Sequence, residues 1–82
     1  STDGIALNIY PNPFKDETTV DFGRVIKEAT ITVIDVYGKL IETHKLESQD
    51  TYIIKRNTKA SGVYFLEIEM EEKVMKYKLI IK

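Results

Sequence analysis

The amino-acid sequence predicts an all-β protein, an Ig-like antiparallel β-sandwich of about seven strands. Three observations predict this fold: apolar and polar residues alternate with a period of two in most segments, turn residues recur between them, and no amphipathic stretch is long enough for a stable helix. The chain has 82 residues and no cysteine. It is therefore expected to be one domain whose stability comes from packing of aliphatic and aromatic side chains.

The final third of the chain shows the clearest alternation. Two consecutive segments each place four apolar residues on one face: Tyr64, Leu66, Ile68 and Met70, and then Met75, Tyr77, Leu79 and Ile81. A two-residue turn at Glu71-Glu72 would pair Leu66 with Tyr77 and Glu67 with Lys76, whereas a longer loop would place Glu67 opposite Lys78. Both registers are acceptable, because only a slip by one residue would bury the charges. The turn lacks an Asn-Gly or Asp-Gly pair, which leaves its type open.

Five further strands are expected before this hairpin. They lie near residues 7–9, 18–22, 29–36, 39–46 and 51–56. Pro11 and Pro13 end the first strand, since proline has no N–H to donate. Residues 24–28 are interpreted as a connection and residues 47–50 as a loop. Ile34 and Val36 lie on the opposite face from Ile31 and Val33, which favours a central strand or a bulge there.

The sequence offers little catalytic chemistry. His44 is the sole histidine, and without a cysteine or a spaced set of partners it is interpreted as an exposed strand residue. The carboxylate pairs Asp16-Glu17 and Glu71-Glu72 are interpreted as solvated turns, because adjacent residues point apart and no calcium-loop motif is present. We therefore expect no enzyme activity, no cofactor, no metal and no small-molecule substrate. The formal net charge of -1 gives no reason to expect nucleic acid as a partner.

Two sets of surface residues remain open to a binding role. Lys76, Lys78 and Lys82 form a basic stripe on one face of the last strand, which is either a solvated face that discourages aggregation or a docking stripe. Among the five tyrosines, Tyr64 and Tyr77 are expected in the core, and Tyr37, at a turn, is the freest to stack on a sugar.

The ends of the sequence suggest a piece of a longer protein. No apolar run is long enough to span a bilayer, and no signal peptide opens the chain. Residues 1–4 are interpreted as a linker or expression remnant, and residues 5–82 as the domain. A fragment of a secreted precursor would show these features.

Four motifs occur in an order and spacing that together resemble a known family. They are Tyr-Pro-Asn-Pro-Phe at 10–14, Ile-Asp-Val-Tyr-Gly-Lys-Leu-Ile at 34–41, Ala-Ser-Gly-Val-Tyr-Phe at 60–65 and Lys-Tyr-Lys-Leu-Ile-Ile-Lys at 76–82. The chain thereby resembles the type A C-terminal sorting domain of the type IX secretion system over nearly its whole length. The departure is Glu71-Glu72, where that family usually has a glycine or asparagine.

The resemblance implies a secretion signal at the end of a larger Gram-negative precursor. The expected partners are a covalently linked N-terminal passenger, the outer-membrane translocon, and a sortase-like peptidase that removes the domain. The passenger would pass through the periplasm and then reach the cell surface or medium, either released or attached to lipopolysaccharide. The resemblance maps the sorting motif onto ten positions: Pro11, Asn12, Pro13, Asp35, Gly38, Gly62, Tyr64, Lys76, Lys78 and Lys82.

Two other interpretations are retained. An Ig-like accessory module of a surface enzyme would bind polysaccharide or space domains, and it would need an exposed aromatic platform. Alternatively, the domain only stabilises its passenger. Removing it would then lower the passenger's melting temperature without blocking export. The sequence also leaves open a weak homodimer formed through an edge strand.

Overall fold

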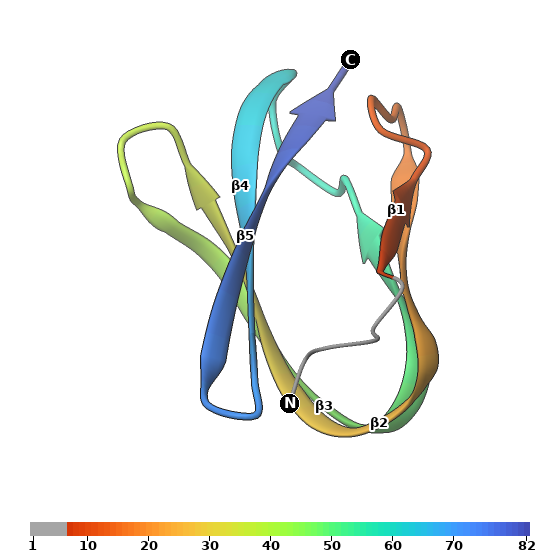
Figure 1. The fold of residues 1–82 in the computed structure, drawn as a ribbon. Coiled ribbons are helices and arrows are strands. Elements are labelled where there is room, and N and C mark those ends of the chain that lie inside the picture. Colours follow the sequence, from red (N-terminus) through yellow and green to blue (C-terminus); the bar gives the residue numbers. More distant parts are fainter. Residues whose placement is uncertain (1–6) are drawn as a thin grey trace.

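The computed structural model describes residues 7–82, which form five β-strands and no helix (Figure 1). The strands are β1 (Asn8–Tyr10), β2 (Glu17–Asp35), β3 (Leu40–Lys55), β4 (Gly62–Met70) and β5 (Lys73–Ile81). All strand pairs are antiparallel. Residues 1–4, the predicted linker, lie outside the described residues. Among the described residues there is accordingly no helix that could cross a membrane.

The long strand β2 organises the sheet. β3 pairs along one edge of β2, while the other edge is shared by β1 near the start of β2 and by β4 near its end. β5 then pairs with β4. Because β2 and β3 bend strongly together, the sheet curls into a half-barrel and encloses the core on its concave side (Figure 1).

The all-β class is confirmed, but the prediction of a sandwich of about seven strands is wrong. The expected connection at 24–28 and the expected loop at 47–50 pair with each other, with Ile26 opposite Gln49 and Glu28 opposite Glu47. A register shift between Asp21 and Ile26 absorbs the bend. Two predicted pairs of short strands are therefore two long, bent strands in one curled sheet.

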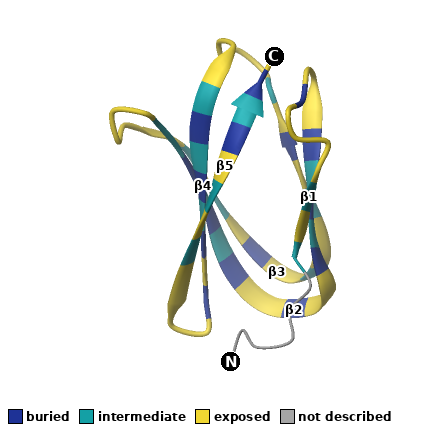
Figure 2. Cartoon of the chain, turned by 45° about the horizontal axis from the view of Figure 1, so that its top comes forward, coloured by how far each residue is buried: buried dark blue, intermediate teal, exposed yellow. Residues whose placement is uncertain are grey.

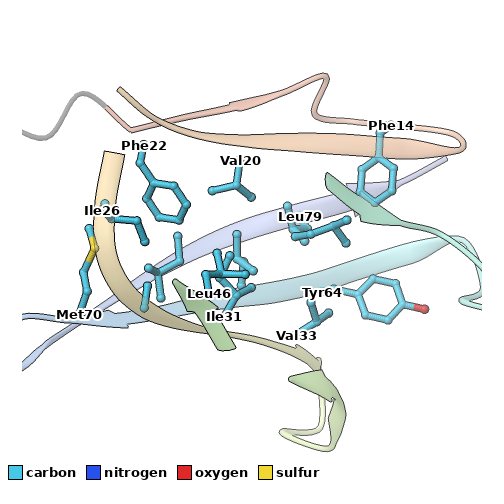
Figure 3. Close-up of a cluster of buried hydrophobic side chains, with 14 of the residues drawn as sticks. Phe14, Val20, Phe22, Ile26, Ile31, Val33, Leu46, Tyr64, Met70 and Leu79 are labelled. Carbon is cyan, nitrogen blue, oxygen red and sulfur yellow. The ribbon is translucent and has the colours of Figure 1, made fainter. Parts of the chain in front are cut away.

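The core is formed by inward-facing residues of β2, β3, β4 and β5 together with Phe14, which lies between β1 and β2. The buried set contains Phe14, Val20, Phe22, Ile26, Ala29, Ile31, Val33, Leu46, Ile54, Tyr64, Leu66, Ile68, Met70, Leu79 and Ile81. Buried and exposed residues alternate along the strands (Figure 2), and the buried side chains meet between the curled layers (Figure 3). Fully burying one such aliphatic or aromatic side chain contributes about 1.5–3 kcal/mol. The predicted inward faces of β4 and β5 are confirmed, with Met75 and Tyr77 partly buried.

The terminal hairpin takes the shorter of the two expected registers. Leu66 lies opposite Tyr77, and Glu67 lies opposite Lys76. Both turn residues have positive φ, 52° for Glu71 and 62° for Glu72. Positive φ at both central residues is the signature of a type I′ turn, whose twist matches that of the flanking strands. This turn therefore forms without the asparagine or glycine that favours it.

Candidate functional site

Asn12 binds the outer edge of β5 through both ends of its carboxamide. Its Nδ2 donates a hydrogen bond to the carbonyl oxygen of Lys78 (2.8 Å), and its Oδ1 accepts one from the N–H of Ile80 (3.0 Å). The side-chain amide thus replaces the peptide group of a neighbouring strand. The flanking Tyr10-Pro11 and Asn12-Pro13 peptide bonds are both cis.

Phe14 continues this cover along β5. Its N–H donates to the carbonyl oxygen of Ile80 (2.9 Å), and its own carbonyl accepts from the N–H of Lys82 (2.9 Å). These bonds form a parallel bridge between Phe14 and Ile81. The ring of Phe14 is buried, so the bridge also closes one end of the core (Figure 3). The segment containing Pro11, Asn12 and Pro13 is therefore held against the last strand.

Asp35 and Gly38 build the turn between β2 and β3. One carboxylate oxygen of Asp35 accepts hydrogen bonds from the N–H groups of Tyr37 and Lys39, both at 2.9 Å. Gly38 adopts φ of 84°, and its N–H donates to the carbonyl oxygen of Asp35 (3.0 Å). The turn holds Tyr37 in solvent at 91% exposure, beside the exposed Val36 and Leu40.

Gly62 and Tyr64 shape the entry into β4. Gly62 has φ of 148°, and a Cβ built there would meet no atom within 4 Å. The requirement for glycine is therefore conformational rather than steric. Tyr64 lies in the core (Figure 3). Its hydroxyl donates a hydrogen bond to the carbonyl oxygen of Ala60 (2.8 Å), which anchors the preceding loop.

The lysines of the closing motif are exposed. Lys76 is paired as expected from the sequence: its Nζ lies 3.4 Å from Glu67 Oε2 and 5.9 Å from the ring centre of Phe65. Lys76 and Lys78 alternate with the inward-facing Tyr77 and Leu79 and so lie on the outer face of β5. Lys82 follows the strand and is also exposed.

Arg56 is a structural centre that the sequence reasoning missed. Its guanidinium donates to the carbonyl oxygens of Lys59 (2.9 Å), Lys15 (3.3 Å) and Lys82 (2.8 Å), and to Ser61 Oγ (2.9 Å). The Ser61 hydroxyl donates to the same carbonyl of Lys82 (2.7 Å). Arg56 therefore ties the end of β3 to the chain on either side of the terminal hairpin. No local sequence pattern distinguishes this arginine from a solvated one.

A polar cluster lies along β3. His44 Nε2 is 2.6 Å from Glu42 Oε2, Lys59 Nζ pairs with the other oxygen of Glu42, and the His44 ring lies against Tyr52. Burial alone would raise the pKa of Glu42, but the hydrogen bonds and charges of Lys59 and His44 lower it. Burial and the Glu42 charge raise the pKa of Tyr52. His44 is therefore half-buried and paired, unlike the exposed residue that the sequence suggested.

Two alternatives to a sorting role, a metal site and an aromatic platform for sugars, can be compared with the arrangement of side chains. Within residues 7–82, no group of three or more His, Cys, Asp or Glu side chains is placed to hold a metal ion. Asp16 precedes β2 and Glu17 is its first residue, opposite Lys55, and both side chains are exposed. Among the tyrosines of residues 7–82, two are more than half exposed, Tyr10 and Tyr37. Tyr10 ends β1, whereas Tyr37 lies in the turn between β2 and β3. The described residues therefore present no continuous aromatic platform.

The strand registers bring the four sequence motifs to one end of the sheet. Asp35 lies opposite Tyr64, and Tyr64 lies opposite Leu79. Asn12 binds on either side of Leu79, at Lys78 and Ile80. Residues that are far apart in the sequence thus form one row across β2, β4 and β5.

The secretion system C-terminal sorting domain family matches residues 8–82. The chain belongs to this family. The resemblance seen in the sequence motifs is thereby confirmed over nearly the whole chain. Families of this kind act as sorting signals and are not catalytic in general. Membership implies a secreted or cell-surface protein and engagement of the sorting domain by the secretion machinery. No curated protein gives a significant match to the chain.

Proposed function

We propose that this sorting domain directs an N-terminal passenger across the outer membrane through the type IX translocon and has no catalytic activity of its own. The family match over residues 8–82 carries the proposal. The gathering of the four motifs at one end of the sheet, in a row across β2, β4 and β5, supports it, since a receptor could bind them as one surface. In this proposal Pro11, Asn12, Pro13, Asp35, Gly38, Gly62 and Tyr64 hold the terminal hairpin in shape, and Lys76, Lys78 and Lys82 face the receptor.

The proposal includes removal of the domain after transport. A sortase-like peptidase cleaves before the domain, assigned from the sequence to residues 5–82 with a linker at 1–4, and the passenger is then released or joined to lipopolysaccharide. The domain has its own hydrophobic core, so it can be removed without disturbing the fold of the passenger. This independence supports cleavage of the domain after transport.

A fusion experiment tests the function. Residues 1–82 are attached to a fluorescent protein with a signal peptide and produced in a bacterium with a type IX system, next to a strain lacking the translocon. We expect fluorescence at the surface or in the medium of the parent strain only. Retention of an intact, folded fusion in the periplasm of both strains would contradict the proposal and favour an accessory module.

A second strain tests the cleavage. A peptidase-deficient mutant should accumulate the uncut fusion, identified by its mass, while the parent strain yields the shorter passenger. Equal masses in the two strains would contradict removal of the domain.

A further inference from the structure

The two edges of β5 differ in how far they are covered. The inner edge pairs with β4 from Lys73, opposite Met70, to Ile81, opposite Gly62. Within the described part of the chain, the outer edge is covered by Asn12 and Phe14, whose hydrogen bonds reach from Lys78 to Lys82. Among the described residues, 7–82, no strand or loop pairs with the outer edge at residues 73–77. As far as residues 7–82 are concerned, roughly half of the last strand therefore has an unpaired outer edge, called the open edge below.

The hydrogen bonds in the covered half of β5 indicate which backbone groups point to the open edge. Lys78, Ile80 and Lys82 use their peptide groups to bind Asn12 and Phe14. In an antiparallel strand the direction of these groups alternates, so Val74 and Lys76 direct their N–H and C=O groups to the same side. Val74 is 61% exposed, and Lys76 is exposed as well. The open edge thus presents donors and acceptors in the spacing of a strand partner.

The segment that contains Asn12 and Phe14 shows that the outer edge of β5 can bind polypeptide. The same segment shows why this pairing ends near Lys78. Asn12 and Phe14 already engage the edge with hydrogen bonds of 2.8 to 3.0 Å. Pro11 and Pro13 have no N–H, so the covering segment cannot extend its pairing toward Lys76. A strand added at residues 73–77 would adjoin Asn12 without displacing it.

Charge selects the occupant of this edge. Lys73, Lys76 and Lys78 are all exposed along it, and within residues 7–82 only Lys76 has an ion-pair partner, Glu67. The other long open edge, on β3, carries mixed charges at Glu42, Lys45 and Glu47 and is interrupted by Ser48 at φ of 52°. An extended segment carrying carboxylates is therefore best matched to the edge of β5.

We propose that residues 73–77 of β5 form a strand-docking edge at which the secretion machinery adds an extended, acidic segment to the sheet. This inference rests on the proposed sorting function and names its point of contact. Backbone hydrogen bonds to Val74 and Lys76 supply affinity, and the lysines select carboxylate side chains. Recognition of this kind depends little on the side chain at position 74, which faces neither the core nor the partner's backbone.

The binding test uses the isolated domain and a short synthetic peptide in which glutamate alternates with valine. Amide NMR signals are followed during titration, with a lysine-valine peptide as the control. We expect saturable shifts at the amides of Val74 and Lys76, and hydrogen exchange at these two amides slowed about tenfold when the peptide is bound. No shift, or shifts confined to β3, or equal shifts with the lysine peptide, would overturn the proposal.

A proline substitution tests the backbone contact directly. Val74→Pro removes an N–H that points outward and leaves pairing with β4 in place, whereas Val74→Ala keeps that N–H. We expect Val74→Pro to weaken peptide binding roughly tenfold and Val74→Ala to leave it nearly unchanged. If Val74→Pro does not fold, Lys73→Glu/Lys78→Glu replaces it, since reversing two exposed charges should abolish selection of the glutamate peptide. Unchanged binding in the folded variant would overturn the proposal.

The fusion assay separates this inference from the sorting function. If the wild-type fusion is exported and the folded Val74→Pro fusion remains in the periplasm, both proposals gain support. If both fusions are exported equally, the docking edge is refuted and the sorting function stands. If the wild-type fusion itself is not exported, the sorting function is refuted, and with it the docking edge as a site read by the secretion machinery.

Discussion

The guanidinium of Arg56 donates a hydrogen bond of 2.8 Å to the carbonyl oxygen of Lys82, joining the end of β3 to the residue after β5. The same side chain binds the carbonyls of Lys59 and Lys15 and the Ser61 hydroxyl. Arg56 is only half-exposed, so these bonds are partly shielded from water. A single side chain thus holds four chain segments at one end of the half-barrel.

Replacing Arg56 should therefore lower stability more than a surface substitution does. Arg56→Ala removes several charge-assisted hydrogen bonds, and we expect a loss of about 2–3 kcal/mol in the free energy of unfolding, measured with urea. Arg56→Lys should recover little of this loss, because an ammonium group lacks the planar fork that reaches several acceptors. A loss below about 0.5 kcal/mol, typical of a surface site, would contradict this role.

The turn of the terminal hairpin offers a stabilising substitution. Glu72 has φ of 62°, a conformation that glycine adopts without strain. We expect Glu72→Gly to raise the free energy of unfolding by about 1 kcal/mol, measured by thermal or urea unfolding. Glu72→Ala is the matched control, since it removes the same charge but keeps a Cβ. An equal gain from alanine would assign the effect to charge rather than to backbone strain.

Asn12 should protect specific amides of β5. Asn12→Ala removes the acceptor of the Ile80 N–H and the donor to Lys78, so the Ile80 amide should exchange faster and stability should fall by about 1–2 kcal/mol. Amide hydrogen exchange followed by NMR measures the first effect and urea unfolding the second. Leu79 is the internal control, because its amide faces β4. Equal acceleration at Leu79 and Ile80 would indicate general loosening rather than the loss of one contact.

Two residues of the turn between β2 and β3, Asp35 and Tyr37, should contribute very differently to stability. Asp35→Ala removes two hydrogen bonds to the turn backbone and should cost about 1–3 kcal/mol. Tyr37→Ala should change stability by less than about 0.5 kcal/mol, because its side chain is almost fully exposed. Urea unfolding of the two variants checks both values. A large loss for Tyr37→Ala would show that its ring packs against the domain in solution.

Acid should weaken the cluster around Glu42. The pKa of Glu42 in the folded protein is lower than its ordinary value of 4.5, so folding favours the charged carboxylate. The stabilisation is present in full above that ordinary value and is lost as the pH falls through the lower folded-state pKa. Urea unfolding between neutral pH and this acidic range should show the loss in the wild type, and Glu42→Gln should flatten it. An equal acid dependence in both proteins would contradict a role for Glu42.

The terminal hairpin could be predicted from the sequence because two physical signals agree there. Period-two alternation indicates which side chains of β4 and β5 face the core, and matching glutamate with lysine excludes a slip by one residue. The choice between Lys76 and Lys78 opposite Glu67 was open in the sequence and is settled by the structure. The bend of β2 and β3 could not be predicted in this way. Residues 47–50 are polar, and polarity indicates a loop unless a partner strand is known to lie opposite. Ile26 is the one residue of 24–28 that could have indicated a continuous strand, since its apolar side chain is buried in a segment that otherwise appears to be a connection.

The candidate site was predicted as a set of motifs but not as an arrangement. Asn12, Gly38 and Tyr64 were selected through a family resemblance, and their contacts with Lys78, Asp35 and Ala60 appear only in three dimensions. The roles of Arg56 and Ser61 could not be predicted because their shared partner is the backbone carbonyl of Lys82. Every residue has such a carbonyl, so the sequence does not show which one is bound. Contacts from side chain to distant backbone are therefore the part of such a site that sequence alone cannot supply.

The bridge between Phe14 and Ile81 has a consequence for how the chain folds as it is made. The two residues lie near opposite ends of the domain, so the buried ring of Phe14 gains its final neighbours only after the last strand has been synthesised. Contacts between such distant residues form late, because loop closure costs entropy before they contribute. A chain that stops short of Leu79 lacks the edge that Asn12 and Phe14 bind. The covered edge of the sheet therefore forms only after the chain has been synthesised through the end of β5, so this part of the native surface is the last to appear.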